Sequence, residues 1–222
     1  MPNEKTLELN ITYEILQFCR QSDPHAFSMG TTLIQESNVG FDSRTLARMP
    51  PSIMTSPLQY KRAKKRLRTG PNSYEYVFEI NNNTYHDQQL ILYHYLAGGR
   101  AQVAYYALPA LWTNAEFIGS IPQLLNRTFF IDVSQIPPTI VDRRTHRIFL
   151  DPQRRTAMLR SEEKRLKVTS ADEYRGLVAE RKIGLPISQM LENMKKPPKD
   201  DFLPRSRRPR FLFNVFWPYL YP

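Results

Sequence analysis

The hydrophobic periods along the first half of the chain constrain the fold most, because they change from helical to strand-like. Apolar residues between Ile11 and Arg20 fall mainly on one face at helical spacing, which predicts a first helix. In the segment 58–61, Leu-Gln-Tyr-Lys, apolar and polar residues alternate at every second position, which is the period of a β-strand. Gln59 and Lys61 are therefore expected to share one face of a sheet.

The remaining segments continue this mixture of helices and strands. We expect strands at 29–35, 40–42, 74–80, 102–108, 128–133 and 147–150, and helices at 84–96, around Glu116, from 170 to about 182, and from 186 towards 195. Pro50-Pro51 interrupts the chain, so that a new element should begin after Pro57. Ser170 and Glu173 form a capping box. This order predicts an α/β fold in which helices flank a central mixed sheet.

Length and composition fit one main domain with appendages. We expect an α/β domain over 1–168, a C-terminal helical extension over 169–196 and a basic, aromatic tail over 197–222 that docks on its own domain or on a partner. The only cysteine is Cys19, which excludes an intramolecular disulfide and a cysteine-built zinc site. No apolar run approaches the roughly 20 residues that span a bilayer, and the N-terminus is too polar for a secretory signal, so a soluble, cytoplasmic protein is expected.

The net charge of +10 and the pI near 9.8 favour polyanionic partners. The segment 61–68 holds six basic residues and no acidic one, and further basic stretches run over 143–167 and 195–210. A solvated surface would explain any one of these runs, but three in one chain favour nucleic acid. The residues of the first run that we expect to contact it are Arg62, Lys64, Lys65, Arg66 and Arg68.

Three polar residues form the main candidate for a catalytic site. Asp42 follows Gly40-Phe41, and Gln59 and Lys61 lie on the predicted strand that comes next. Hydrolysis of a phosphodiester needs a hard cation, for which a carboxylate is the natural ligand, and a lysine can stabilise the developing negative charge. A turn residue at position 42 and a surface lysine at position 61 remain the structural alternatives.

This pattern resembles the PD-(D/E)XK nuclease superfamily over roughly residues 8–108, and specifically its Mrr-like restriction variant, in which glutamine replaces the acidic residue before x-Lys. The chain is also similar to bacterial proteins that share the same G-x-D and Q-x-K. The resemblance implies that Asp42 binds Mg²⁺ or Mn²⁺, that Gln59 occupies the place of the second ligand, and that Lys61 is the catalytic lysine. It also implies that Glu14 on the first helix supports the metal, with Glu36 as the rival for this role.

The function implied by the resemblance is cleavage of DNA in bacterial restriction or anti-phage defence. Since the sequence lacks a Gly-rich phosphate loop, such a nuclease would work beside an ATPase or sensor subunit, as a homo-oligomer or as part of a complex. Because Gln59 is neutral, the alternative is a non-catalytic nucleic-acid-binding or assembly subunit that keeps the nuclease-like fold. Salt-dependent binding without metal-dependent cleavage would identify the alternative.

Overall fold

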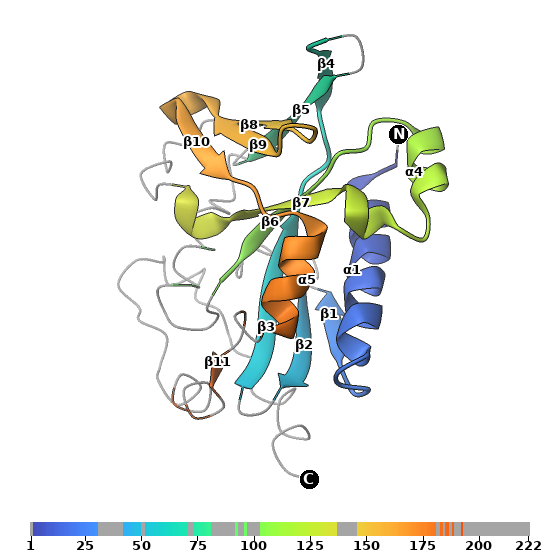
Figure 1. The fold of residues 1–222 in the computed structure, drawn as a ribbon, viewed down its shortest axis with the longest axis vertical. Helices are drawn as coiled ribbons and strands as arrows, with labels where there is room; N and C mark the ends of the chain where they lie inside the picture. The colour runs from blue at the N-terminus through green and yellow to red at the C-terminus, as the bar shows by residue number, and fades with distance from the viewer. Residues whose placement is uncertain are drawn as a thin grey trace, which may run out of the picture.

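The chain folds into two β-sheets and, among the described residues, three α-helices, as a computed structural model shows (Figure 1). The structure describes residues 2–30, 42–49, 52–70, 73–80, 103–136 and 146–180, together with 92, 96, 183, 185–186, 188 and 192. The prediction of an α/β fold is confirmed. None of the described helices is long and apolar enough to cross a membrane.

The first sheet, called sheet A, is mixed and has the strand order β1-β2-β3-β6-β7, with β11 added at one end of β3. Its strands are β1 (Phe27–Gly30), β2 (Ser43–Met49), β3 (Ser52–Tyr60), β6 (Tyr105–Pro109), β7 (Thr128–Asp132) and β11 (Leu185–Pro186). Strand β3 pairs antiparallel with β2 and parallel with β6. Strand β3 therefore lies between β2 and the later strand β6 in sheet A.

The second sheet, called sheet B, is wholly antiparallel and was not expected as a separate sheet. Its order is β10-β9-β8-β5-β4. The strands are β4 (Lys65–Arg68), β5 (Tyr74–Ile80), β8 (His146–Asp151), β9 (Thr156–Leu159) and β10 (Lys164–Lys167). Strands β4, β9 and β10 were not predicted, because each has only four residues and because the charged residues of β4 and β10 hide the two-residue period.

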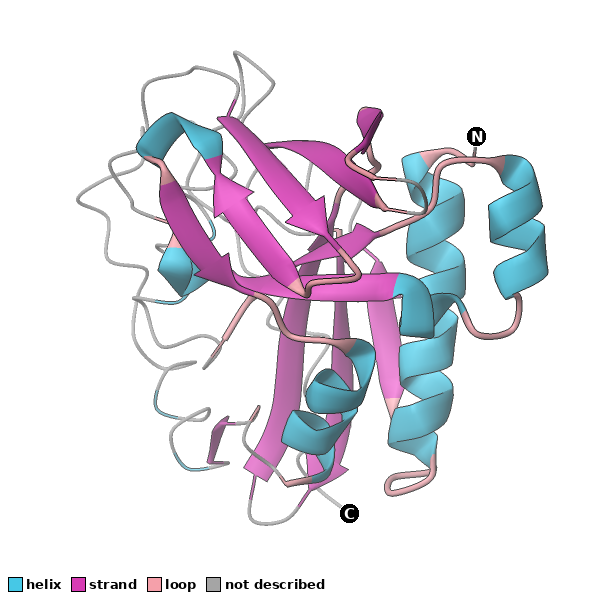
Figure 2. Cartoon of the chain, turned by 45° about the horizontal axis from the view of Figure 1, so that its top comes forward, coloured by secondary structure: helices cyan, strands magenta, loops and turns pink. Residues whose placement is uncertain are grey.

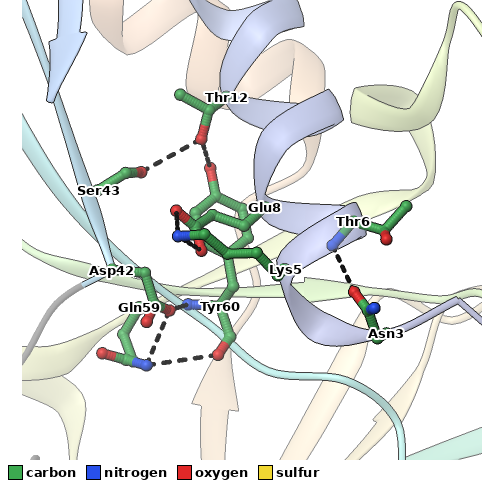
Figure 3. Close-up of polar contacts among 9 residues, drawn as sticks. All are labelled: Asn3, Lys5, Thr6, Glu8, Thr12, Asp42, Ser43, Gln59 and Tyr60. Atoms are coloured by element: carbon green, nitrogen blue, oxygen red, sulfur yellow. Dashed lines mark hydrogen bonds and ion pairs between the residues drawn. The ribbon is translucent and has the colours of Figure 1, made fainter. Parts of the chain in front are cut away.

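Helix α1 (Glu4–Arg20) begins seven residues before the predicted start. The side chain of Asn3 accepts a hydrogen bond from the backbone N–H of Thr6 at 2.7 Å and so caps the helix (Figure 3). The two other described helices are α4 (Asn114–Ser120) and α5 (Ala171–Ala179), and each begins with a capping box. The box predicted at Ser170 is confirmed.

The layers are α1 and α5, then sheet A, then sheet B, which lies across one end of sheet A (Figures 1 and 2). Between sheet A and the helices lie Ile11, Ile15, Leu58, Tyr60, Tyr105, Phe130, Tyr174 and Val178. Between the two sheets lie Tyr76, Phe78, Tyr106, Leu108, Ile131, Ile148, Leu150 and Leu159. Sheet A is thus covered on both faces, which explains why β6 and β7 are almost continuously apolar.

Two proline predictions are wrong. Strand β3 does not begin after Pro57 but passes through it, with Pro57 paired to Arg44 of β2. The pairing with β6 begins only at Leu58, so a missing N–H is tolerated on that edge. Pro186 lies in β11 and not in the first turn of a helix, although positions 188 and 192, the only other described residues of the helix predicted from 186 towards 195, are helical.

The predicted strands at 74–80, 102–108, 128–133 and 147–150 correspond to β5, β6, β7 and β8, within a few residues. The predicted helices around Glu116 and from 170 correspond to α4 and α5, although α5 ends at Ala179. The helix expected at 84–96 lies outside the described residues except for positions 92 and 96, which are helical, and the tail at 197–222 lies wholly outside them. The strand at 29–35 is described only as far as Gly30, and that at 40–42 only at Asp42, which directly precedes β2.

Candidate functional site

Asp42 and Gln59 lie side by side at one end of sheet A, where β2 begins and β3 ends. The ladder pairs Ser43 with Leu58, so the next positions, Asp42 and Gln59, lie opposite each other. The amide nitrogen of Gln59 donates to Oδ2 of Asp42 at 2.8 Å, and the backbone N–H of Tyr60 donates to the same oxygen at 2.6 Å (Figure 3). Both side chains are buried, with 7% of Asp42 and none of Gln59 exposed. The carboxylate is therefore held rigidly by two donors.

Lys61 continues the alternation of β3 beyond its last residue. Its backbone N–H donates to the carbonyl oxygen of Ala107 at 3.1 Å, so that the main chain still follows β6. Side chains alternate across a sheet, which places Lys61 on the face of Gln59 and away from the face of Tyr60 that α1 covers. Lys61 is also buried, with 7% exposed. The shared face of Gln59 and Lys61 rests on this alternation and stays a prediction for the side chain of Lys61.

The charge of Asp42 acts on two buried phenols. Burial raises the pKa of both Tyr60 and Tyr106, and the negative charge of Asp42 raises each further. The hydroxyl of Tyr60 hydrogen-bonds with Oγ1 of Thr12 at 2.8 Å, which partly offsets the effect. Burial and the neighbouring charge of Asp42 thus favour the neutral form of both tyrosines.

Glu8 is a buried carboxylate on the face of α1 that covers Tyr60, and the sequence analysis did not single it out. It lies on α1, is 5% exposed, and accepts hydrogen bonds from Nζ of Lys5 at 2.7 and 2.8 Å (Figure 3). A Cβ atom built on Gly30 would lie 4.0 Å from Oε1 of Glu8, and Gly30 pairs with Ser43, the neighbour of Asp42. The charge of Glu8, like that of Asp42, acts on Tyr60. The carboxylate of α1 at this end of the sheet is therefore Glu8.

A sequence signal for Glu8 existed. Its position falls at the helical spacing of Ile11, Ile15 and Cys19, which form the buried face of α1. A carboxylate on such a face must be paired or functional, because burial of an unpaired charge is strongly unfavourable. The signal was lost because the helix was predicted to begin only at Ile11.

Glu14 does not have the role that the resemblance implied. Its Oε1 and Oε2 accept hydrogen bonds from the backbone N–H groups of Leu124 and Leu125, both at 2.8 Å. These groups open the short 3₁₀ helix η1 (Leu124–Arg127), so Glu14 caps a helix start. Six residues at about 1.5 Å each separate Glu14 from Glu8 along α1, and this distance explains why only Glu8 reaches the end of the sheet near Asp42.

The described residues contain no group of three or more His, Cys, Asp or Glu side chains that could hold a metal ion. Glu36, the second residue proposed as support for the metal, lies outside the described residues. The candidate ligand at the site is thus the carboxylate of Asp42, because the amide nitrogen of Gln59 points towards Asp42 and its amide oxygen points away. A single carboxylate fits Mg²⁺ or Mn²⁺ in part, because Mg²⁺ often uses one or two carboxylates and completes its shell with water and substrate phosphate.

The structure divides the basic residues of segment 61–68 into two groups. Arg66 forms an ion pair with Glu116 at 2.5 Å, and its guanidinium lies 4.4 Å from the ring centre of Tyr74. Burial acts to lower the pKa of Arg66, but hydrogen bonding with Tyr76 and the charge of Glu116 raise it overall. Arg66 is therefore a structural link between β4 and α4.

The other members of this segment are available at the surface to different degrees. Lys64, Lys65 and Arg68 are exposed. Arg62 is half-buried, and its backbone N–H donates to Oε2 of Glu4 at 2.9 Å. The exposed members begin three residues after Lys61, close to the candidate site along the chain.

No family model, no curated protein and no solved structure matches this chain. The arguments for its function therefore come from the site itself.

Proposed function

We propose that this protein is a metal-dependent nuclease that cleaves DNA phosphodiester bonds, with Asp42, Gln59 and Lys61 at its active site. The observation that carries the proposal is the 2.8 Å hydrogen bond between Gln59 and Asp42, with Lys61 next on the same face. The bacterial restriction or anti-phage setting, and the PD-(D/E)XK core itself, rest on the sequence resemblance and belong to the same proposal.

The chemistry divides among the residues as follows. Asp42 would hold Mg²⁺ or Mn²⁺, with water and substrate phosphate completing the shell, and the ion when bound would polarise the phosphate and activate water. The nitrogen of Gln59 and the backbone N–H of Tyr60 fix the carboxylate, so that its orientation does not change when substrate arrives. Lys61 would contribute a positive charge that stabilises the negative charge on the phosphoryl oxygens in the transition state.

Glu8 adds a second carboxylate at the same end of the sheet. Its two oxygens are held by Lys5, whose side chain is 58% exposed. Because Glu8 is only 5% exposed, loss of Lys5 would leave a buried charge unpaired, so the ion pair is retained and Glu8 contributes to this end of the sheet through its negative charge.

The test is cleavage of plasmid and linear DNA with Mg²⁺ or Mn²⁺, with a chelator as the negative control. Asp42→Asn keeps an oxygen to accept from Tyr60 but removes the charge, and Lys61→Gln removes the cation. Asp172→Asn is the matched control, since Asp172 is 87% exposed on α5. We expect loss of cleavage in the first two variants alone. Equal cleavage by all four proteins would reject the proposal.

A second function is favoured by one observation. Oδ2 of Asp42 already accepts two hydrogen bonds, and its strand partner Gln59 is neutral, which weakens metal binding compared with two carboxylates. A nucleic-acid-binding or assembly subunit with the same fold would have this arrangement. DNA binding that weakens steeply with salt, with no cleavage under any divalent metal, would support this second function.

A further inference from the structure

The face of sheet B that is turned away from the core carries a group of arginines around one aromatic ring. In β8, Ile148 and Leu150 lie in the core between the sheets, so Arg147 and Phe149 lie on the opposite face. Phe149 is half-buried and Arg147 is exposed. An aromatic side chain that remains partly exposed on a sheet surface is a candidate for contact with a ligand.

The strand register brings two more arginines to Phe149. Phe149 pairs with Met158 of β9, and Met158 pairs with Arg165 of β10. Neighbouring strands lie about 4.8 Å apart, so Arg165 is about 10 Å from Phe149 along this row. The guanidinium of Arg160, at the end of β9, lies 4.9 Å from the ring centre of Phe149. We call Arg147, Phe149, Arg160 and Arg165 the arginine-aromatic face.

The strands of this surface carry more basic than acidic side chains. Among the described residues, the basic ones on the strands and at Arg160 are Lys65, Arg147, Arg160, Arg165 and Lys167, and the three acids on the strands are Glu75, Glu79 and Asp151. Two further exposed acids, Glu162 and Glu163, follow Arg160 before β10. Glu79 is paired with Arg147 at 3.3 Å and Asp151 with Arg154 at 3.6 Å. Two of the three acids are thus neutralised locally, while Arg160 and Arg165 are exposed.

We propose that the arginine-aromatic face binds single-stranded nucleic acid, with a base stacked on the Arg160–Phe149 pair and phosphates beside Arg165 and Arg147. Bases stack both on aromatic rings and on guanidinium planes, and the Arg160–Phe149 pair offers both in one column. A duplex keeps its bases stacked inside and offers this pair only phosphates. The exposed arginines can contact the phosphates of single-stranded or duplex nucleic acid, whereas the Arg160–Phe149 pair favours the single strand.

This inference rests on the proposed function in one respect, since the bound strand would lead to the candidate active site. Strand β4 of sheet B begins four residues after Lys61, so the end of β3 and the second sheet are joined by a short segment. Strand β4 is the edge strand opposite β10, so a nucleic-acid strand bound at Arg165 would have to extend across sheet B to reach the end of sheet A that carries Asp42. The binding itself needs neither metal nor cleavage.

The experiment is fluorescence anisotropy with a labelled oligothymidine of about 16 nucleotides, near the upper limit of common site sizes, and with a duplex of equal length. Chelator is present throughout, so cleavage cannot interfere. Arg165→Gln is compared with Arg175→Gln, which removes the same charge from α5, on the opposite side of sheet A. Phe149→Leu removes the ring and keeps an apolar side chain.

We expect Arg165→Gln to lower the slope of log affinity against log salt by about 0.7, the value for one single-strand phosphate contact, while Arg175→Gln keeps the slope of the unaltered protein. Phe149→Leu should weaken single-strand binding about tenfold and duplex binding much less. Equal slopes for the two arginine variants, or equal weakening of single-strand and duplex binding by Phe149→Leu, would overturn the inference.

The two proposals fail in distinguishable ways. Asp42→Asn should bind the single strand as well as the unaltered protein while it no longer cleaves. If Asp42→Asn cleaves normally but Arg165→Gln binds weakly, the nuclease assignment fails and the binding face stands. If Asp42→Asn loses cleavage but Arg165→Gln binds like Arg175→Gln, the active site stands and the binding face fails.

Discussion

The substitution Gln59→Glu tests the geometry of the candidate site most directly. The amide nitrogen of Gln59 now donates to Oδ2 of Asp42 at 2.8 Å, in a place where both side chains are buried. The substitution replaces this donor with a second carboxylate that faces the first. It therefore exchanges a hydrogen bond for a repulsion, and it also creates the pair of acidic ligands that a divalent cation prefers.

The size of the effect follows from the distance. Two unit charges about 4 Å apart at an effective dielectric constant near 20 repel by about 4 kcal/mol. The lost hydrogen bond to a charged group adds roughly 1.5 to 3 kcal/mol. Protonation of one of the two carboxylates removes the repulsion, so its cost sets an upper limit on the destabilisation. For a glutamate with a reference pKa near 4.3, that cost at pH 8 is about 5 kcal/mol, at about 1.4 kcal/mol for each pH unit. For a chain of this length that lowers Tm by about 10 °C or more.

The assay is thermal unfolding in chelator and in Mg²⁺ or Mn²⁺, with Gln59→Met as the control that loses the hydrogen bond without adding charge. Gln59→Glu should be far less stable than Gln59→Met in chelator at pH 8, and the difference should shrink near pH 5, where one proton can bridge the carboxylates. A metal at 100 times its dissociation constant should restore about 2.7 kcal/mol. Equal Tm values for the two variants in chelator would refute the placement of Asp42 against residue 59. If Mg²⁺ or Mn²⁺ leaves the Tm of Gln59→Glu unchanged, the ion site is refuted.

Three further predictions concern stability and ionisation. Glu14→Ala should destabilise the protein by about 3 kcal/mol or more in urea unfolding, because two backbone donors of η1 lose a charged acceptor. Gln17→Ala, on the exposed face of α1, is the control and should change the stability little. Equal stability of the two variants would contradict the capping role. Tyr60 and Tyr106 should stay neutral when other phenols ionise, because burial raises the pKa of each. The stability of the fold should therefore be retained below about pH 10 and lost above it. Phenolate absorbance that reaches its full value before the protein unfolds would disprove this. Burial raises the pKa of Cys19 to about 12, so a thiol reagent should modify it only as fast as the protein unfolds, and rapid modification of the folded protein would contradict its burial in the core.

Residues that act through local patterns could be predicted from the sequence. The alternation at 58–61 placed Gln59 and Lys61 on one face because the side-chain period of a strand depends on nothing outside the strand. The capping box at Ser170 and the interruption at Pro50-Pro51 are local in the same sense, and β2 ends at Met49 and β3 begins at Ser52, as the prolines require. Local stereochemistry was sufficient for these features.

Contacts between segments distant in the chain could not be predicted in this way. Glu14 and Glu8 both lie on α1, and only the packing of that helix decides that Glu14 meets η1, 110 residues later, while Glu8 reaches the end of β1. Helical spacing gives the face of a residue but not what the face meets.

The sequence by itself therefore determined the α/β class, the positive net charge and the alternation that puts Gln59 on the face opposite Tyr60. Only the tertiary structure decided that the described strands form two sheets, that Asp42 lies against Gln59, and that Arg160 lies over Phe149. The reason is physical: periodicity and capping depend on neighbours within one or two turns, whereas strand pairing and packing depend on segments that the chain brings together only when it folds.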